Sequence, residues 1–281
     1  MKQSTIFFGA SSYVIPLIQL LNEKYQLKLV VTTEQKPTDP VPSHCITHGI
    51  SYISVTKFDE TLRSKLLALS SSFAVLADFR LMVKEDVLNL FPKGIINIHP
   101  SLLPEYRGPT PGVAALLDGR ETTGVSLMLL DTQLDHGPLI GQVSEHILPS
   151  DTAVSLYEKL FAKGAQLLEE KLPLYLEGKI EPKEQDHSKA TYTDFLTRDS
   201  GYIDYHKLSA IISHTRLEQM IKAYFPWPGV WTKVSVKGKA LRVKFLPEQR
   251  VQVEGKNPMS YKDFMNGYEQ GKNILQKLQL I

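Results

Sequence analysis

Short apolar runs alternate with helix-like segments along the first 150 residues, and this alternation restricts the fold more than any other feature. The strand-like runs are Ser4–Phe8, Leu27–Thr33, Tyr52–Val55, Phe73–Ala77 and Ile95–Ile98. Apolar residues at helical spacing separate or follow these runs, at residues 14–21, 62–69, 84–90 and 112–117. Such an alternation predicts an α/β fold in which helices cover a mostly parallel sheet.

Two further strands and one long helix are predicted after this region. The strands cover Val125–Leu130 and Gly141–Ile147. The helix covers Asp151–Glu177, because apolar residues recur there at helical spacing. Ser150 and Asp151 are its candidate N-caps, and Gly178 is expected to end it.

The character of the sequence changes between residues 200 and 206, which predicts a domain boundary. A helix is expected over Lys207–Tyr224, and the prolines that follow stop it. Residues 262–280 are predicted to be helical and amphipathic. A small antiparallel β unit is predicted from three alternating segments, residues 230–236, 239–246 and 250–254. We therefore predict two domains, residues 1–203 and 204–281.

The formal net charge of +2 hides an asymmetry between the two parts of the chain. Residues 207–256 hold ten Lys/Arg and three Asp/Glu, a local net charge of +7, so the rest of the chain carries −5. A basic segment beside a mildly acidic main body indicates a module that faces a polyanion. A solvated basic surface without a partner explains the charge alone equally well.

The cysteine content and the lengths of the apolar runs indicate the cellular compartment of the protein. A single cysteine, Cys45, excludes an internal disulfide framework and fits a reducing environment. The first residues lack the apolar stretch of a secretory signal peptide. Every apolar run is shorter than the roughly 18 residues that span a bilayer. We therefore expect a cytoplasmic protein.

Three features carry weak functional signals. Gly9 follows the first strand as in a dinucleotide-binding turn, but the other glycines of that fingerprint are absent, so a tight turn is the better interpretation. His44 and His48 are spaced to share a helix face, yet their segment is proline-rich and without an HExxH pattern, which favours solvated histidines. Trp227, between two prolines, is interpreted as a packing anchor.

The strongest candidate site lies at the end of the predicted strand Ile95–Ile98. Side chains alternate along a strand, so Asn97 and His99 share one face while isoleucines occupy the other. They project from the carboxyl end of a buried strand, where ligand sites form in open α/β sheets. Pro100 and Pro104 then fix the loop. By itself, this spacing is a weak signal, and a loop cap explains it better than a catalytic pair.

Two longer segments give this pair a context. INIHPSLLPEYRGPTP, residues 96–111, and TGVSLMLLDTQLDHGPLI, residues 123–140, closely resemble the signature of the 10-formyltetrahydrofolate-dependent formyltransferases. The resemblance implies a Rossmann-like catalytic domain and a catalytic trio of Asn97, His99 and Asp135. It also implies a folate site bordered by Ser101, Leu102, Leu103 and Pro104. 10-Formyltetrahydrofolate is the expected co-substrate, and no metal is expected.

The chemistry of such enzymes suits these side chains. An amine attacks the formyl carbon, and negative charge develops on the formyl oxygen. The amide of Asn97 and a protonated His99 can donate hydrogen bonds to that oxygen, and one such donor typically lowers a barrier by about 3–4 kcal/mol. Asp135 can hold the imidazolium and assist removal of the amine proton.

Within the family, the resemblance to the methionyl-tRNA formyltransferases runs along nearly the whole chain. It includes residues 203–228 and 255–268, which resemble their interdomain passage and C-terminal signature. It implies a small β-rich (OB-like) C-terminal domain that contacts tRNA, initiator methionyl-tRNA as the acceptor, and a monomer. The alternative in the same family is a sugar-nucleotide N-formyltransferase with the same trio and folate donor. A silent RNA-binding relative or a formate-releasing hydrolase agrees less well with an intact trio.

Two segments depart from the pattern of the tRNA enzymes. Thr33–Ser43 is short and holds one Lys and no Arg, where those enzymes carry a glycine-rich basic insertion. In the expected folate loop, residues 78–81, Arg80 stands where a glycine is usual. These departures suggest two hypotheses. Other residues recognise the acceptor end of the tRNA, and Arg80 pairs with the glutamate tail of folate.

Overall fold

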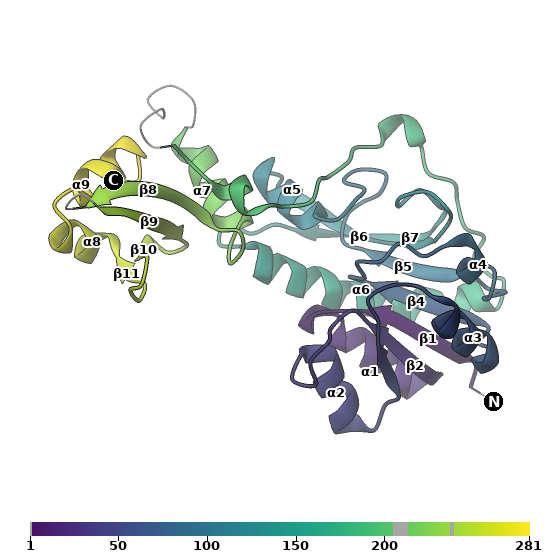
Figure 1. Ribbon diagram of the computed structural model, residues 1–281. Coiled ribbons are helices and arrows are strands. Elements are labelled where there is room, and N and C mark those ends of the chain that lie inside the picture. Colours follow the sequence, from purple (N-terminus) through teal and green to yellow (C-terminus); the bar gives the residue numbers. More distant parts are fainter. Residues whose placement is uncertain (1, 205–212, 237–238) are drawn as a thin grey trace. The chain divides into compact units, whose positions relative to one another are not determined.

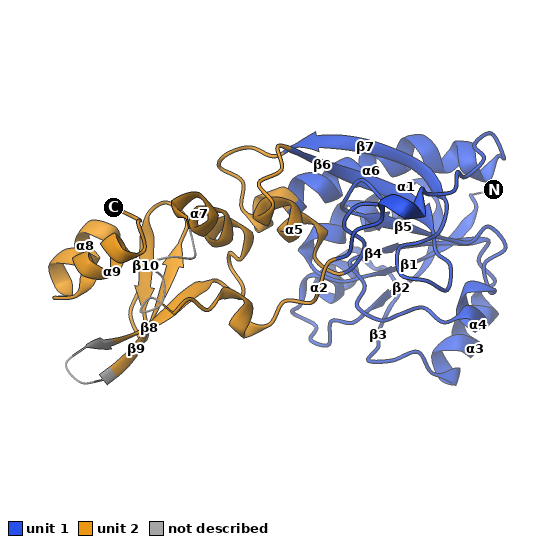
Figure 2. Ribbon diagram, turned by 90° about the horizontal axis from the view of Figure 1, so that it is seen from above, with its two compact units in different colours: residues 1–108, 122–146, 157–192 blue, residues 109–121, 147–156, 193–281 orange. Residues whose placement is uncertain are grey.

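The computed structural model describes residues 2–204, 213–236 and 239–281, with the side chains of 235, 236 and 239 left aside. The chain separates into two compact units (Figure 2). Unit 1 comprises Met1–Gly108, Thr122–His146 and Tyr157–Tyr192. Unit 2 comprises Pro109–Glu121, Ile147–Leu156 and Thr193–Ile281. The division into domains at 203/204 stays a prediction, since three stretches before it, residues 109–121, 147–156 and 193–203, cluster with the C-terminal part.

Unit 1 is built on a seven-stranded sheet with the order β3-β2-β1-β4-β5-β6-β7 (Figure 1). Its strands are β1 (Ser4–Gly9), β2 (Gln26–Thr32), β3 (Tyr52–Ser54), β4 (Phe73–Ala77), β5 (Ile95–His99), β6 (Thr122–Leu129) and β7 (Leu139–His146). The first five pair in parallel, whereas β5–β6 and β6–β7 pair antiparallel. The predicted α/β class with a mostly parallel sheet is confirmed.

The predicted apolar patterns correspond to α1 (Ile15–Lys24), α3 (Glu60–Leu69), α4 (Glu85–Leu88) and α6 (Ala153–Leu176). A further helix, α2 (Pro40–His48), was not predicted. One buried apolar cluster joins α3 and α4 to the sheet and includes Phe8, Leu66 and Ile95. On the opposite face, Gly164 lets α6 approach Ile98, because a Cβ there would lie 2.8 Å from the Ile98 side chain.

The long helix α6 differs from its prediction at the N-terminus. It begins at Ala153, so the cap position falls on Thr152, whose Oγ1 accepts from the Ser155 amide at 3.4 Å. The carboxylate of Asp151 instead accepts a hydrogen bond from the Ser155 hydroxyl at 3.0 Å. The predicted end is correct, because Gly178 takes the left-handed conformation, with φ of 73°, that commonly ends a helix.

Unit 2 contains a four-stranded antiparallel sheet with the order β11-β10-β9-β8. Its strands are β8 (Val230–Val236), β9 (Lys239–Leu246), β10 (Arg250–Val253) and β11 (Met259–Ser260). Its helices are α5 (Pro111–Leu117), α7 (His214–Ala223), α8 (Tyr261–Gly267) and α9 (Gly271–Lys277), with the 3₁₀ turn η3 (Arg198–Gly201). The predicted small β-rich part is confirmed.

Three local expectations in this unit need correction or completion. The predicted helix Lys207–Tyr224 is seen as α7, while residues 205–212 lie outside the described part of the chain. The terminal segment forms two short helices, because Tyr268 is extended and separates α8 from α9. Trp227 is 57% exposed in the turn before β8, so it is not a packing anchor. Trp231, on the strand itself, is the buried tryptophan.

No helix in the described ranges is long and apolar enough to cross a membrane.

Candidate active site in unit 1

Strand β5 places the two predicted polar side chains next to each other. Residue 97 pairs with Leu76 of the parallel strand β4 and with Met128 of the antiparallel strand β6, so the backbone around it is fixed on both sides. Asn97 and His99 are 6% and 4% exposed, and the intervening Ile98 is buried on the other face. The alternation predicted from the sequence thus describes the strand, and the polar pair lies in a largely desolvated place.

Asp135 reaches this pair from the loop that follows β6. Its carboxylate accepts a hydrogen bond from Asn97 Nδ2 through Oδ1, at 3.3 Å, and one from the Gly108 amide through Oδ2, at 2.7 Å. Its backbone takes the left-handed conformation, with φ of 47°, which is uncommon outside glycine although aspartate and asparagine adopt it more readily than most residues. Such a conformation is retained where the surroundings hold it, often at functional sites. The three predicted residues therefore form one cluster.

The His99 ring lies between two acceptors. Its Nε2 is 3.0 Å from the carbonyl oxygen of Tyr106, which can only accept, so this nitrogen carries a hydrogen. Its Nδ1 is 3.6 Å from Asp135 Oδ2, an ion-pair distance when the ring is protonated. A doubly protonated imidazolium is thus the form in which both nitrogens have complementary partners.

A buried arginine and a glutamine support the Asp135 loop. Arg107 is 2% exposed, and its Nη2 donates to Gln185 Oε1 at 2.7 Å and to His187 Nδ1 at 2.8 Å. Gln185 Nε2 in turn donates to the backbone carbonyls of Asp135, at 3.0 Å, and of Gly137, at 2.7 Å. Gln185 therefore ties the loop to Arg107. The sequence interpretation missed Gln185, because it belongs to no motif and lies 50 residues beyond Asp135.

A second interaction within the same loop involves histidines. Asp131 Oδ2 lies 2.7 Å from Nδ1 of His136. The His136 ring stacks on the ring of His187, with centroids 3.9 Å apart and planes within 6°. Because His187 also receives the Arg107 hydrogen bond, this pair adds a further contact between the loop and the segment after α6.

The predicted folate-site residues fall into two groups. Ser101 and Leu103 are buried and hydrogen-bonded: the Ser101 hydroxyl donates to the Glu105 carbonyl at 2.7 Å, and the Leu103 amide donates to the Ser126 hydroxyl at 3.0 Å. They shape the loop. Leu102 and Pro104 are half-buried and are the members of this segment that retain exposed surface.

The weak candidates from the sequence have structural explanations. A Cβ on Gly9 would lie 2.8 Å from the Ala77 carbonyl oxygen, so the glycine permits close approach of β4. His44 and His48 do share a face of α2, with ring centroids 4.1 Å apart. Among the residues that the structure describes, no group of three His, Cys, Asp or Glu side chains is arranged to hold a metal ion.

Comparison with known proteins decides the family. The family model described as formyl transferase matches residues 17–172, which include β5 and the Asp135 loop. The chain belongs to the formyl transferase family.

This formyltransferase is similar in sequence to several curated bacterial enzymes. It is 38% identical over 248 residues to a methionyl-tRNA formyltransferase of Chloroflexus aurantiacus. The match covers 85% of this chain and 78% of that protein. It is 36% identical to a methionyl-tRNA formyltransferase of Geobacillus thermodenitrificans, over 81% of this chain and 73% of that protein.

Solved structures agree with the fold. A sugar N-formyltransferase from Shewanella superposes with a TM-score of 0.68 at 18% identity, covering 87% of this chain and 96% of that chain. A glycinamide ribonucleotide transformylase from Symbiobacterium toebii gives a TM-score of 0.57 at 23% identity, covering 66% and 95%. At such identities the likeness establishes the formyltransferase architecture and does not distinguish among acceptors.

Proposed function

We propose that this formyltransferase moves the formyl group of 10-formyltetrahydrofolate to the free amino group of initiator methionyl-tRNA. The observation that carries the proposal is the buried cluster of Asn97, His99 and Asp135 in a chain 36–38% identical to several methionyl-tRNA formyltransferases. In this proposal, residues 1–203 form the catalytic domain and residues 204–281 a basic domain that contacts tRNA. The monomeric state and the cytoplasmic location stay predictions.

Asn97 and His99 are proposed to stabilise the charge that develops on the formyl oxygen. Asn97 Nδ2 has two hydrogens and uses one for Asp135 in this structure, so the other is available to an incoming oxygen. In the buried surroundings of β5 a donor of this kind interacts more strongly than it would in water. Hydrogen bonds of catalytic groups commonly shorten when substrate binds, which suits the 3.3 Å and 3.6 Å separations around Asp135.

Asp135 is proposed to assist removal of the proton from the attacking amine while it holds His99. Its Oδ2 is shared between the Gly108 amide and the His99 ring, and its Oδ1 faces Asn97. Asp135 is 9% exposed, against 6% for Asn97 and 4% for His99. The folate co-substrate supplies the reactive carbon, and the protein supplies position and electrostatics.

The loop of Ser101–Pro104 is proposed to border the folate. Two solved neighbours are described as complexes with folate derivatives, 5-N-formyl-tetrahydrofolate in one and folinic acid in the other. In this chain, the half-buried Leu102 and Pro104 offer the apolar surface on which a flat ring can pack, while the buried Ser101 and Leu103 hold the loop in shape.

The acceptor is tested by a panel assay with 10-formyltetrahydrofolate as donor. Methionyl initiator tRNA, methionyl elongator tRNA and amino-sugar nucleotides are offered side by side, with uncharged tRNA as the blank. We expect formyl-methionyl initiator tRNA to be the preferred product. Formylation of an amino-sugar nucleotide alone would contradict the proposed acceptor and would favour a sugar-nucleotide N-formyltransferase, the class to which several structural neighbours belong.

A further inference from the structure

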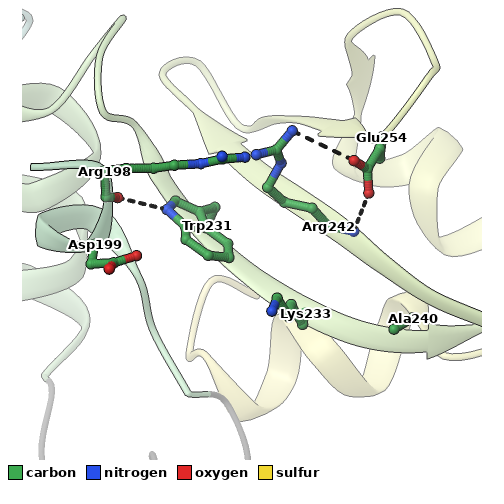
Figure 3. Close-up of a pocket in the computed structure, with 7 residues that line it drawn as sticks. All are labelled: Arg198, Asp199, Trp231, Lys233, Ala240, Arg242 and Glu254. Atoms are coloured by element: carbon green, nitrogen blue, oxygen red, sulfur yellow. Dashed lines mark hydrogen bonds and ion pairs between the residues drawn. The ribbon is translucent and has the colours of Figure 1, made fainter.

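A cavity of about 410 Å³ lies within unit 2, and its lining includes no residue of the trio (Figure 3). Arg198 of η3, Lys233 of β8 and Arg242 of β9 line it, together with two carboxylates and Trp231. Its volume falls in the range of small-molecule sites, about 300–1,000 Å³. Three cationic and two anionic side chains leave one positive charge, so an anion is the ligand that the cavity favours.

The sheet register places two of these cations directly opposite each other. Lys233 pairs with Arg242 across the β8–β9 ladder. Like charges at directly opposed positions of an antiparallel pair destabilise the sheet. On the other face of the same strands, Thr232, Val243 and Phe245 are buried, so the charged pair lies on the polar face. An anion bound beside Lys233 and Arg242 would convert this repulsion into attraction.

Trp231 holds the arginines at the cavity. The guanidinium carbons of Arg198 and Arg242 each lie 5.9 Å from the centroid of its ring, within cation–π distance. The indole Nε1 donates to the Arg198 carbonyl at 3.0 Å, and the Tyr202 ring packs against the indole with centroids 4.7 Å apart. In Figure 3 both arginine side chains extend toward the space beside the indole.

Only one of the three cations has a carboxylate partner among the described residues. Arg242 lies 3.6 Å from Glu254 Oε1, and its backbone amide donates to Glu254 Oε2 at 3.2 Å. Within the same described ranges, neither Arg198 nor Lys233 forms an ion pair. A guanidinium presents its N–H groups as a planar fork that matches the oxygens of a phosphate. Once Arg242 and Glu254 are paired, Arg198 and Lys233 outnumber the remaining carboxylate of the lining, Asp199, and leave one net positive charge.

We propose that this cavity is a phosphate-binding subsite that receives a phosphodiester group of a polynucleotide. Arg198 donates to the non-bridging oxygens, Lys233 adds a second positive charge, and Arg242, oriented by Glu254, closes the site from β9. A polynucleotide is favoured over a free phosphate because the surrounding segment, residues 207–256, carries a net charge of +7. The identity of the polynucleotide as tRNA rests on the function proposed above.

Binding of uncharged tRNA over a range of salt concentrations tests the subsite. The variant Arg198→Gln/Lys233→Gln is compared with Lys262→Gln/Lys272→Gln, which removes the same charge from exposed positions of α8 and α9. Each lost phosphate contact lowers the slope of log K against log salt by about 1. We expect a loss of about 1 in the cavity variant, because the cavity receives one phosphodiester group, and a much smaller change in the control. Equal slopes for both variants would overturn the proposal, and unchanged thermal melting verifies folding.

The indole offers a second readout that reports from the cavity itself. The chain has two tryptophans, so in a Trp227→Phe protein all indole emission comes from Trp231. We expect tRNA to change this emission saturably and Arg198→Gln/Lys233→Gln to abolish the change, with inorganic phosphate giving the same change only at far higher concentration. A nucleoside diphosphate that binds tightly and is not displaced by tRNA would overturn the assignment to a polynucleotide.

Different experimental outcomes would contradict the proposed subsite and the proposed acceptor. A wild-type protein that binds tRNA through the cavity but formylates none of it would contradict the proposed function and leave the subsite intact. A protein that formylates methionyl-tRNA equally well with and without Arg198 and Lys233, at every salt concentration, would contradict the subsite alone.

Discussion

At the scale of single residues, the candidate site is concentrated on one carboxylate. Asp135 receives hydrogen bonds from Asn97 and Gly108 and faces His99, while its own carbonyl is held by Gln185. The positive φ of Asp135 means that its position depends on these partners and on no regular element.

Asp135→Asn removes the negative charge and one acceptor while keeping the shape of the side chain. We expect kcat to fall by about 10²- to 10⁴-fold, the usual contribution of a positioned acid or base, with unchanged circular dichroism. The matched control is Asp131→Asn, a carboxylate of the same loop that pairs with His136 instead of the trio. Full activity of Asp135→Asn, or an equal loss in the control, would contradict the assigned role.

Gln185 is expected to act as a positioning residue. Gln185→Glu keeps an oxygen for Arg107 but cannot donate to the carbonyls of Asp135 and Gly137. We expect kcat to fall about 10- to 100-fold with little change in KM for folate, because a displaced loop misplaces the carboxylate. If the variant lowers only the melting temperature and leaves kcat intact, Gln185 serves stability alone.

At the scale of elements, the strands were predictable because β-branched and aromatic runs in unit 1 are buried on both faces. β4 was predicted at its observed bounds, and β1 and β5 to within one residue. Helix α2 was not predicted, because its prolines resemble a loop; Pro40 and Pro42 occupy the first turn, where the missing N–H costs nothing. The terminal segment was predicted as one helical stretch, because amphipathic spacing continues across the break between α8 and α9.

Helix α3 provides a quantitative test of how much an N-cap side chain stabilises the protein. Asp59 caps it, with Oδ1 accepting from the Leu62 amide at 3.0 Å. Asp59→Ala leaves that amide without its partner, and we expect the free energy of unfolding to fall by about 1 kcal/mol. Asp59→Asn retains an acceptor and is expected to lose far less. Chemical denaturation of the three proteins measures both values, and indistinguishable midpoints would contradict the capping role.

At the scale of the whole molecule, net charge was a poor guide to which cations are available. The +7 segment includes Lys244, whose Nζ donates to the Pro226 carbonyl at 2.6 Å and whose pKa is lowered by burial, so it serves packing. Arg198 lies outside that segment yet lines the cavity. Counting charges along the sequence could not distinguish a cation that packs, such as Lys244, from one that lines the cavity. That distinction depends on the register of β8 and β9.

The stability of the whole fold should also depend on pH through Cys45. Burial, and secondarily the charge of Glu34, raises the pKa of this thiol to about 11 from 9.0. The folded state therefore binds the thiol proton more tightly than the unfolded state does. The resulting contribution to the free energy of unfolding is complete below pH 9 and is lost as the pH rises to about 11. A shift of this size corresponds to about 2–3 kcal/mol.

Cys45→Ala isolates that contribution. The difference in unfolding free energy between wild type and Cys45→Ala should shrink between pH 9 and 11, as measured by urea denaturation. A constant difference would show that the thiol ionises at its ordinary value. The same raised pKa predicts slow alkylation by iodoacetamide in the native state and fast alkylation in urea.

The candidate active site draws its parts from places far apart along the chain: Asn97 is 38 residues before Asp135, and Gln185 is 50 residues after it. Contacts of such long sequence separation close large loops and form slowly. The residues of the trio therefore acquire their geometry only when the segment beyond α6 has returned to the sheet. A nascent chain that has completed β1 to β5 would hold two members of the candidate trio without the third, so the candidate site is completed late in folding.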